Sequence, residues 1–201
     1  MLGPELFEHL NARQRVGNQR PVIYGAKGLS AHDFGKIEDQ LGFLLPADFI
    51  FLFANLQDPG GVLFPWANFK MENYRQSIRS IWEGIAFDIE HNVWLDRWGV
   101  RPSNLSAALE VARADFLTWP KLLPICGHRY LAAEPHRSGN PVFSIKQLDI
   151  ICYGADLARY LMIEFLGADW KTHAFDPLVR RADVWSDIAE GRIDPYASLR
   201  S

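Results

Sequence analysis

The segment from His128 to Ser144, HRYLAAEPHRSGNPVFS, gathers side chains that could act in catalysis: two histidines, two arginines, a tyrosine and an asparagine. A histidine that works as a general acid or base needs its partners within hydrogen-bond distance. If the segment begins as a strand, His128 and Tyr130 lie on one face and Arg129 on the other. Side chains on opposite faces do not act on one atom, so catalysis by this triplet is disfavoured.

The middle of the same segment is typical of a chain reversal. Gly139, Asn140 and two prolines lie between Glu134 and Pro141, and these residue types favour turns. We therefore interpret the polar residues as the connection of a β-hairpin.

An alternative interpretation keeps the segment as a reaction or ligand site. In it, His128, Arg129 and Asp149 converge in a pocket between helices and sheet, as in a small hydrolase or a ligand-binding enzyme. A deep pocket shared by these three side chains distinguishes the alternative from the hairpin interpretation.

Other patterns associated with catalysis or metal binding are not found in the sequence. It contains no GxSxG, GxxxxGK[ST], CxxC or HExxH motif. Its two cysteines, Cys126 and Cys152, lie in apolar segments rather than at helix N-termini, where a thiol pKa is lowered. We expect no catalytic residue, no metal site and no cofactor.

Composition restricts the class of protein. A chain of 201 residues with 48% hydrophobic residues can bury a core of its own, so we expect a single domain over residues 1–201. With 21 basic and 24 acidic residues, the net charge of −3 gives no long-range attraction to nucleic acid or anionic membranes. The first residues lack the pattern of a secretory signal, and no apolar run reaches membrane-spanning length. These features indicate a cytoplasmic protein.

Periodicity predicts helices before and after a run of strands. Apolar spacing indicates helices over residues 4–15, 30–41, 46–56, 68–91, 103–116, 155–166 and 183–190. Between the helices at 103–116 and 155–166, the chain contains three β-rich segments separated by turn residues: LLPICGHRYLAA, NPVFSI and LDIICYG. The sequence thus predicts an α+β fold, with helices packed on one face of an antiparallel sheet.

Two tryptophans four residues apart, Trp94 and Trp98, flank the charged residues Asp96 and Arg97. Aromatic side chains beside charges are common in recognition surfaces. Gly99 permits close packing next to Trp98, which we assign to the core, and Trp94 is left open between core and surface.

Three segments, in order, resemble the SUKH superfamily, which includes the Smi/Knr family of yeast cell-wall-assembly regulators and many bacterial proteins. They are KIEDQLGFLLPADFIFLFANLQDPGG, PKLLPICGHRYLAAEPHRSGNPVFSIKQLDIICYG and DLARYLMIEF. The match covers about residues 30–167. The helix at 68–93 with its WLDRWGVRP continuation, and the tail after 167, have no counterpart in the smallest members. Either could carry the partner surface or thicken the core.

This resemblance implies a SUKH-like α+β fold and a binding role without catalysis. Many bacterial members are immunity proteins that bind and neutralise a co-encoded toxin, often a nuclease. We therefore expect a non-catalytic protein-binding domain, with a toxin domain as its partner in the immunity case. The residues we expect to contact the partner are Trp66, Trp94, Arg129, Tyr130 and Arg137.

Overall fold

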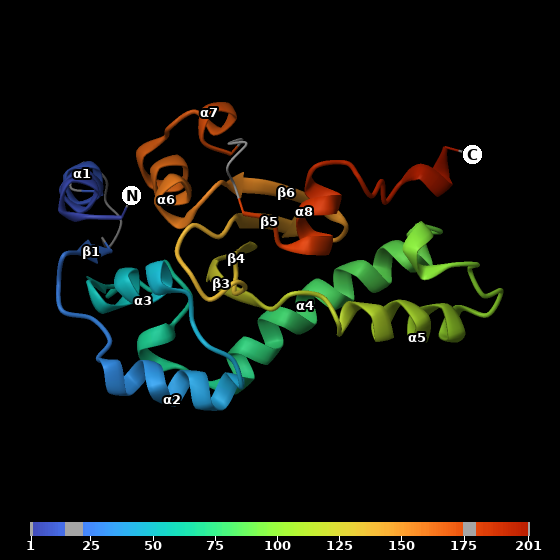
Figure 1. Cartoon of the computed structure of the whole chain (residues 1–201), viewed down its shortest axis with the longest axis horizontal. Coiled ribbons are helices and arrows are strands. Elements are labelled where there is room, and N and C mark those ends of the chain that lie inside the picture. Colours follow the sequence, from blue (N-terminus) through green and yellow to red (C-terminus); the bar gives the residue numbers. More distant parts are fainter. Residues whose placement is uncertain (1, 15–21, 175–179, 201) are drawn as a thin grey trace.

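The computed structural model describes residues 2–14, 22–174 and 180–200 (Figure 1). Its helices are α1 (Pro4–Gln14), α2 (Ala31–Leu41), α3 (Ala47–Ala54), α4 (Met71–Glu90), α5 (Leu105–Phe116), α6 (Leu157–Leu166), α7 (Trp170–Ala174) and α8 (Asp183–Ala189). Its strands are β1 (Ile23–Tyr24), β2 (Leu56–Gln57), β3 (Leu122–Cys126), β4 (Arg129–Ala132), β5 (Val142–Lys146) and β6 (Asp149–Gly154). Short 3₁₀ turns are η1 (Trp66–Asn68), η2 (Asp96–Trp98) and η3 (Ala197–Leu199). The predicted α+β class is confirmed; Arg15, the end of the first predicted helix, and the break after it lie outside the described residues.

A four-stranded antiparallel sheet forms the centre, with strand order β3-β4-β5-β6. Each strand pairs with the next one along the chain, and β4 pairs with β5 through Arg129 opposite Ser144 and Leu131 opposite Val142. The polar segment therefore forms two antiparallel strands and their connection, which confirms the predicted hairpin. A separate two-stranded sheet pairs β1 with β2.

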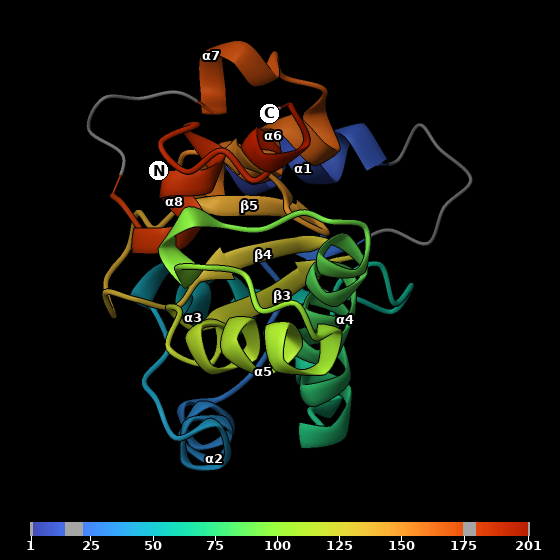
Figure 2. The same cartoon turned by 90° about the vertical axis from the view of Figure 1, so that its right-hand side faces the viewer.

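Helices cover both faces of the central sheet, and the expectation of one covered face is corrected. Strand residues alternate between two apolar cores: Leu123, Ile125, Leu131 and Val142 lie in one, and Leu122, Tyr130, Phe143 and Ile145 in the other. The first core contains α1, α2, α3 and α6, and the second contains α4, α5 and α8 (Figure 2). Strands that are apolar on both faces need two helical layers, because either face left open would expose core side chains to water.

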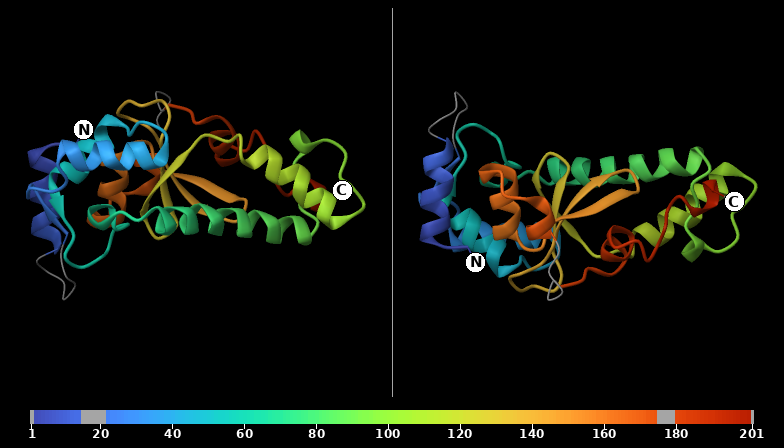
Figure 3. Two further views of the ribbon diagram at one scale, coloured as in Figure 1. Left: turned by 90° about the horizontal axis from the view of Figure 1, so that it is seen from below. Right: turned by 90° about the horizontal axis from the view of Figure 1, so that it is seen from above.

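Helices α4 and α5 form most of the second layer and extend past the end of the sheet, opposite α1 (Figure 3). Helix α4 is held against the β5–β6 turn at two points. The buried Asp88 carboxylate accepts a hydrogen bond from the Leu148 amide at 2.8 Å. One turn earlier, a Cβ on Gly84 would lie 3.1 Å from the Gln147 Cα, so glycine allows the close approach. The segment of α4 and α5 therefore thickens the core.

The edge strand β3 is closed by hydrogen bonds from the segment that precedes it. Pro124 has no amide proton to offer at this edge. Three β3 carbonyls accept from other parts of the chain: Leu122 from the Tyr74 hydroxyl (3.2 Å), Pro124 from the Trp66 indole (2.9 Å) and Ile125 from the Phe64 amide (2.7 Å). The β3 edge is thus bonded to residues 64–74.

Gly154, at the end of β6, is predicted to tolerate no side chain. A Cβ there would lie 2.7 Å from the Tyr160 Cα in α6, so Gly154→Ala should lower the free energy of unfolding by about 1–3 kcal/mol, as overpacked cores do. The matched control is Gly35→Ala in α2, where a Cβ meets nothing within 4 Å; it should stabilise by up to about 1 kcal/mol. Urea unfolding measures both, and equal effects would contradict the close contact.

Candidate functional site

Three of the five residues expected to contact a partner are buried, and their prediction as surface contacts is wrong. Trp66 is 1% exposed, Trp94 7% and Tyr130 4%. The polar atom of each bonds to a backbone carbonyl: the Trp66 indole to Pro124, the Trp94 indole to Gly99 (2.7 Å) and the Tyr130 hydroxyl to Ser77 (3.2 Å). Large aromatic rings contribute much apolar area, and the second helical layer gives Trp94 and Tyr130 a core to fill.

Trp98 packs in the core, as its neighbouring glycine indicated. Its ring meets that of Trp94 edge to face, with centroids 4.9 Å apart. Its indole donates to the Asp115 carboxylate at 3.0 Å, which also accepts from Trp119 at 2.8 Å and from Arg97 at 2.9 Å. Burial alone would raise the pKa of Asp115, but these three donors lower it. Arg97 therefore supports the packing of Trp98 through the carboxylate that both of them contact.

Arg129 ties strand β4 to helix α6. Its Nε lies 3.3 Å from a Glu164 carboxylate oxygen, and a terminal nitrogen donates to the Ser144 hydroxyl at 2.9 Å. The guanidinium carbon sits 3.9 Å from the centre of the Tyr153 ring, a cation–π contact. With its side chain mostly covered, Arg129 acts as an internal connection.

The alternative pocket of His128, Arg129 and Asp149 does not form. His128 lies in the β3–β4 turn and lines a small pocket against α4, and its imidazole contacts the Arg129 guanidinium. Arg129 makes its other contacts with Glu164 of α6, on the opposite face, and with Ser144 and Tyr153 of the sheet. Asp149 lies opposite Lys146 in the strand register of the β5–β6 hairpin and does not line the pocket of His128.

The thiols are not activated as nucleophiles. Burial raises the pKa of Cys126, with the Glu164 charge adding to it, and burial raises the pKa of Cys152 to about 12. A thiol with a raised pKa stays protonated at neutral pH and is a weak nucleophile. Within the described ranges, no three His, Cys, Asp or Glu side chains gather as a metal site requires.

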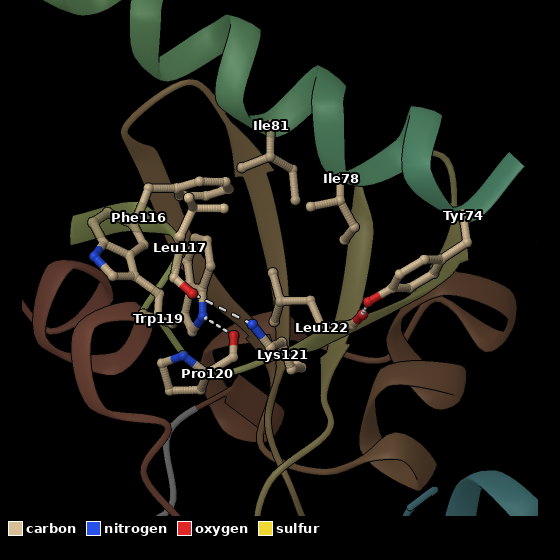
Figure 4. Close-up of a pocket in the computed structure, with 10 residues that line it drawn as sticks. Tyr74, Ile78, Ile81, Phe116, Leu117, Trp119, Pro120, Lys121 and Leu122 are labelled. Carbon is tan, nitrogen blue, oxygen red and sulfur yellow. Dashed lines mark hydrogen bonds between the residues drawn. The ribbon is translucent and has the colours of Figure 1, made fainter. Parts of the chain in front are cut away.

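Surface hollows elsewhere offer less to a ligand. The groove between α4 and the α5–β3 connection is apolar, and its volume of about 70 Å³ is that of a packing gap (Figure 4). A cavity of about 740 Å³ lies beside the double-glycine turn. Two of its polar side chains are used internally: the Asp58 carboxylate accepts from the Val62 and Leu63 amides, and the Gln57 amide donates to the Lys27 carbonyl.

A second cavity of about 550 Å³, here named the acidic pocket, places two carboxylates beside the polar loop. Its lining comes from four parts of the chain: Leu2, Ala47, Asp48 and Phe51, Ser138 and Gly139, Asp156 and Ala158. The Phe51 ring is 40% exposed, and it stacks on Phe7 with centroids 5.9 Å apart. The pocket therefore joins two acidic groups to an apolar wall.

Asp48 sits in the first turn of α3 and is 8% exposed. Its carboxylate accepts from the Gly139 amide at 2.9 Å and from the Phe49 amide at 3.0 Å. Burial raises its pKa and the Asp156 charge adds to the rise, while these amide donors oppose it. A positive group entering the pocket would offset the cost of ionising this carboxyl.

Asp156 caps the N-terminus of α6, where its side chain accepts from the Arg159 amide at 2.8 Å. The Arg159 guanidinium lies 3.8 Å from the second oxygen. On the other side of the pocket, the buried Asn140 amide donates to the Ala132 and Pro135 carbonyls and fixes the loop that carries Ser138 and Gly139.

Sequence reasoning missed both carboxylates of the acidic pocket. Each carries a local signal, since an aspartate after proline and an aspartate before an apolar run are typical of helix starts. These signals predict that each aspartate lies at the start of a helix, but they do not predict that the two side chains line one cavity. Asp48 and Gly139 are joined across 91 positions of the chain.

No family model, curated protein or solved structure matches the chain. The SUKH resemblance accordingly stays an expectation from its three segments. None of the helices in the described ranges combines the length and apolarity needed to cross a lipid bilayer.

The raised pKa of Asp48 predicts a pH-dependent penalty on folding. Its folded pKa lies above the ordinary value of 3.8, so the folded state holds this proton more tightly than the unfolded state. The stabilisation of the folded state by this bound proton is fully present below pH 3.8, and it is lost as the pH rises through the pKa of Asp48 in the folded state. Asp48→Asn should therefore gain stability relative to the unsubstituted protein between pH 3.8 and 7, measured by urea unfolding. A difference that stays constant with pH would contradict the raised pKa.

Loss of the Arg129 connection is predicted to destabilise the protein. Arg129→Met leaves Glu164 without its partner and removes the contact over Tyr153, at a cost of about 2 kcal/mol. Arg79→Met, at an exposed site of α4, should cost less than about 0.5 kcal/mol. Thermal unfolding of the two variants tests this, and similar melting temperatures would refute the structural role.

Proposed function

We propose that the protein is a non-catalytic protein-binding domain that acts in the cytoplasm, and that the acidic pocket receives a basic side chain of its partner. The observation that carries the proposal is the pairing of Asp48 and Asp156 in one cavity beside the exposed Phe51. The SUKH resemblance extends it to an immunity role, with a co-encoded toxin as the partner.

The lining of the pocket suits the two parts of an arginine or lysine side chain. The aliphatic stem can pack on Phe51, and the charged head can bind the carboxylates. Because Asp48 is buried, its interaction with such a head is screened less than a surface ion pair. A basic surface is expected of a nuclease toxin, which must bind a polyanion.

Arg137 remains a proposed contact residue. It is exposed on the loop that also supplies Ser138 and Gly139 to the pocket. An acidic group on the partner could pair with it at the rim, where an ion pair contributes more to orientation than to affinity.

A binding role is favoured over the hydrolase alternative by how the polar groups are used. Arg129 is engaged with Glu164, Ser144 and Tyr153, and both Asp48 oxygens accept backbone hydrogen bonds. The Asp48 carboxyl, whose pKa burial raises, is thus held by backbone amides as part of the fold.

The test is affinity for an identified partner. The tagged full chain is used to capture proteins from a lysate of the source cells, and a partner found by mass spectrometry is titrated calorimetrically. Asp48→Asn and Asp156→Asn should each weaken binding about tenfold or more, which is about 1.4 kcal/mol. Asn can still cap α6 at position 156. Asp39→Asn, at an exposed site of α2 with the same change in charge, should leave the affinity unchanged.

Equal affinities for all three variants would refute the pocket as the contact site. Hydrolytic activity of the purified protein that Asp48→Asn abolishes would refute the non-catalytic role. The immunity extension is tested separately: a gene adjacent to this one is expressed alone and together with it, and growth arrest that this protein relieves is the expected result. Relief that survives Asp48→Asn and Asp156→Asn together would contradict a contact through the pocket.

A further inference from the structure

A third hollow, here named the basic pocket, lies at the end of the sheet where the β3–β4 and β5–β6 turns meet α4. Its volume is about 280 Å³. Gly127 and His128 line it from the first turn, Lys146 and Gln147 from the second, and Ser80 and Gly84 from the helix. None of its lining residues is acidic.

The fold holds these groups together through contacts already described. Gly84 admits the backbone of Gln147, and Asp88 bonds the next amide of that turn. The two turns are joined directly, because the Ile145 amide donates to the His128 carbonyl at 3.0 Å. Lys146 and His128 therefore come from rigid neighbouring turns.

The permanent positive charge that lines the basic pocket comes from Lys146, because Glu164 pairs with Arg129 and compensates its charge. The Arg129 guanidinium contacts the His128 imidazole, and Glu164, the carboxylate that pairs with Arg129, lies on α6 across the sheet. Lys146 makes no ion pair within 4 Å in the described part of the chain. Burial lowers the pKa of His128, and the charges of Arg129 and Lys146 add to this, while Glu164 opposes it. A concave site lined by an ammonium group and by no carboxylate has a positive potential that attracts anions.

The donors left unused in the pocket fit an oxyanion with several oxygens. The Ser80 and Tyr130 hydroxyls both donate to the Ser77 carbonyl, so they are engaged. The Lys146 ammonium, the second imidazole nitrogen of His128 and the Gln147 side-chain amide remain, and they come from two sides of the hollow.

We propose that the basic pocket binds the phosphate group of a small phosphate monoester, with Lys146 and His128 as the principal contacts and Gln147 as a further donor. A phosphate presents several oxygens to one charged donor, the Lys146 ammonium, and to two neutral donors, the Nδ1–H of His128 and the Gln147 side-chain amide. A carboxylate, with two oxygens, would leave one of these donors unused. The inference is independent of the acidic pocket.

Nuclear magnetic resonance tests the proposal through the histidine Cε1–H signals of the full chain, with that of His128 assigned by His128→Gln. Inorganic phosphate and glycerol 3-phosphate are added separately, against sodium chloride at equal ionic strength. Both phosphates should shift the His128 signal saturably and raise its pKa, since a bound anion stabilises the imidazolium. Tighter binding of glycerol 3-phosphate indicates a monoester ligand, and tighter binding of inorganic phosphate indicates the free ion and overturns the monoester assignment.

Lys146→Met should weaken phosphate binding at least tenfold, while Lys36→Met, an exposed lysine of α2 with the same change in charge, should not. Circular dichroism establishes that both variants are folded. A His128 signal that responds to chloride as it does to phosphate would overturn the proposal. So would phosphate binding that Lys146→Met leaves unchanged.

Discussion

Burial of the central sheet on both faces is the constraint on which the remaining structure depends. Most strand side chains between Leu122 and Ile150 belong to one of two apolar cores. Polar groups that could recognise a ligand are thereby displaced to turns and helix ends. In a meander, alternate connections lie at opposite ends of the sheet. The acidic pocket follows the β4–β5 loop, and the basic pocket follows the two turns at the other end.

Arg129 shows how the fold accommodates charge within this layered arrangement. It stands on a strand, where its neighbours Tyr130 and Leu131 are buried in opposite cores. A carboxylate, a hydroxyl and an aromatic face meet its guanidinium, so the charge is compensated without full access to water. The composition of the polar segment therefore reflects packing at Arg129 and chain reversal at the loop, and only the exposed loop residues remain for contact with other molecules.

Local patterns predicted the elements well. Period-3.6 spacing located α4 and α8, and turn residues located the β4–β5 connection. These patterns did not predict which side chains are exposed to solvent. Trp66, Trp94 and Tyr130 were expected at the surface. For Trp94 and Tyr130 the reason is that the second helical layer was not foreseen, although the continuous apolar runs LLPIC and YLAA are typical of strands covered on both sides. Trp66 lies in the first core, where its indole reaches the Pro124 carbonyl of β3 from a distant part of the chain. The carboxylates of the acidic pocket were out of reach for another reason: Asp48 and Asp156 look like ordinary helix starts, and their proximity depends on how α3 and α6 meet.

The occupied carbonyls of β3 restrict how another protein can engage this one. A partner that binds by extending a sheet needs a row of free amides and carbonyls along an outer strand. Here the proline removes one donor, and indole, hydroxyl and amide groups occupy three acceptors. The same closure protects against edge-to-edge association of copies, the usual hazard of an uncovered outer strand. Recognition at this side of the molecule must therefore rely on side-chain surfaces.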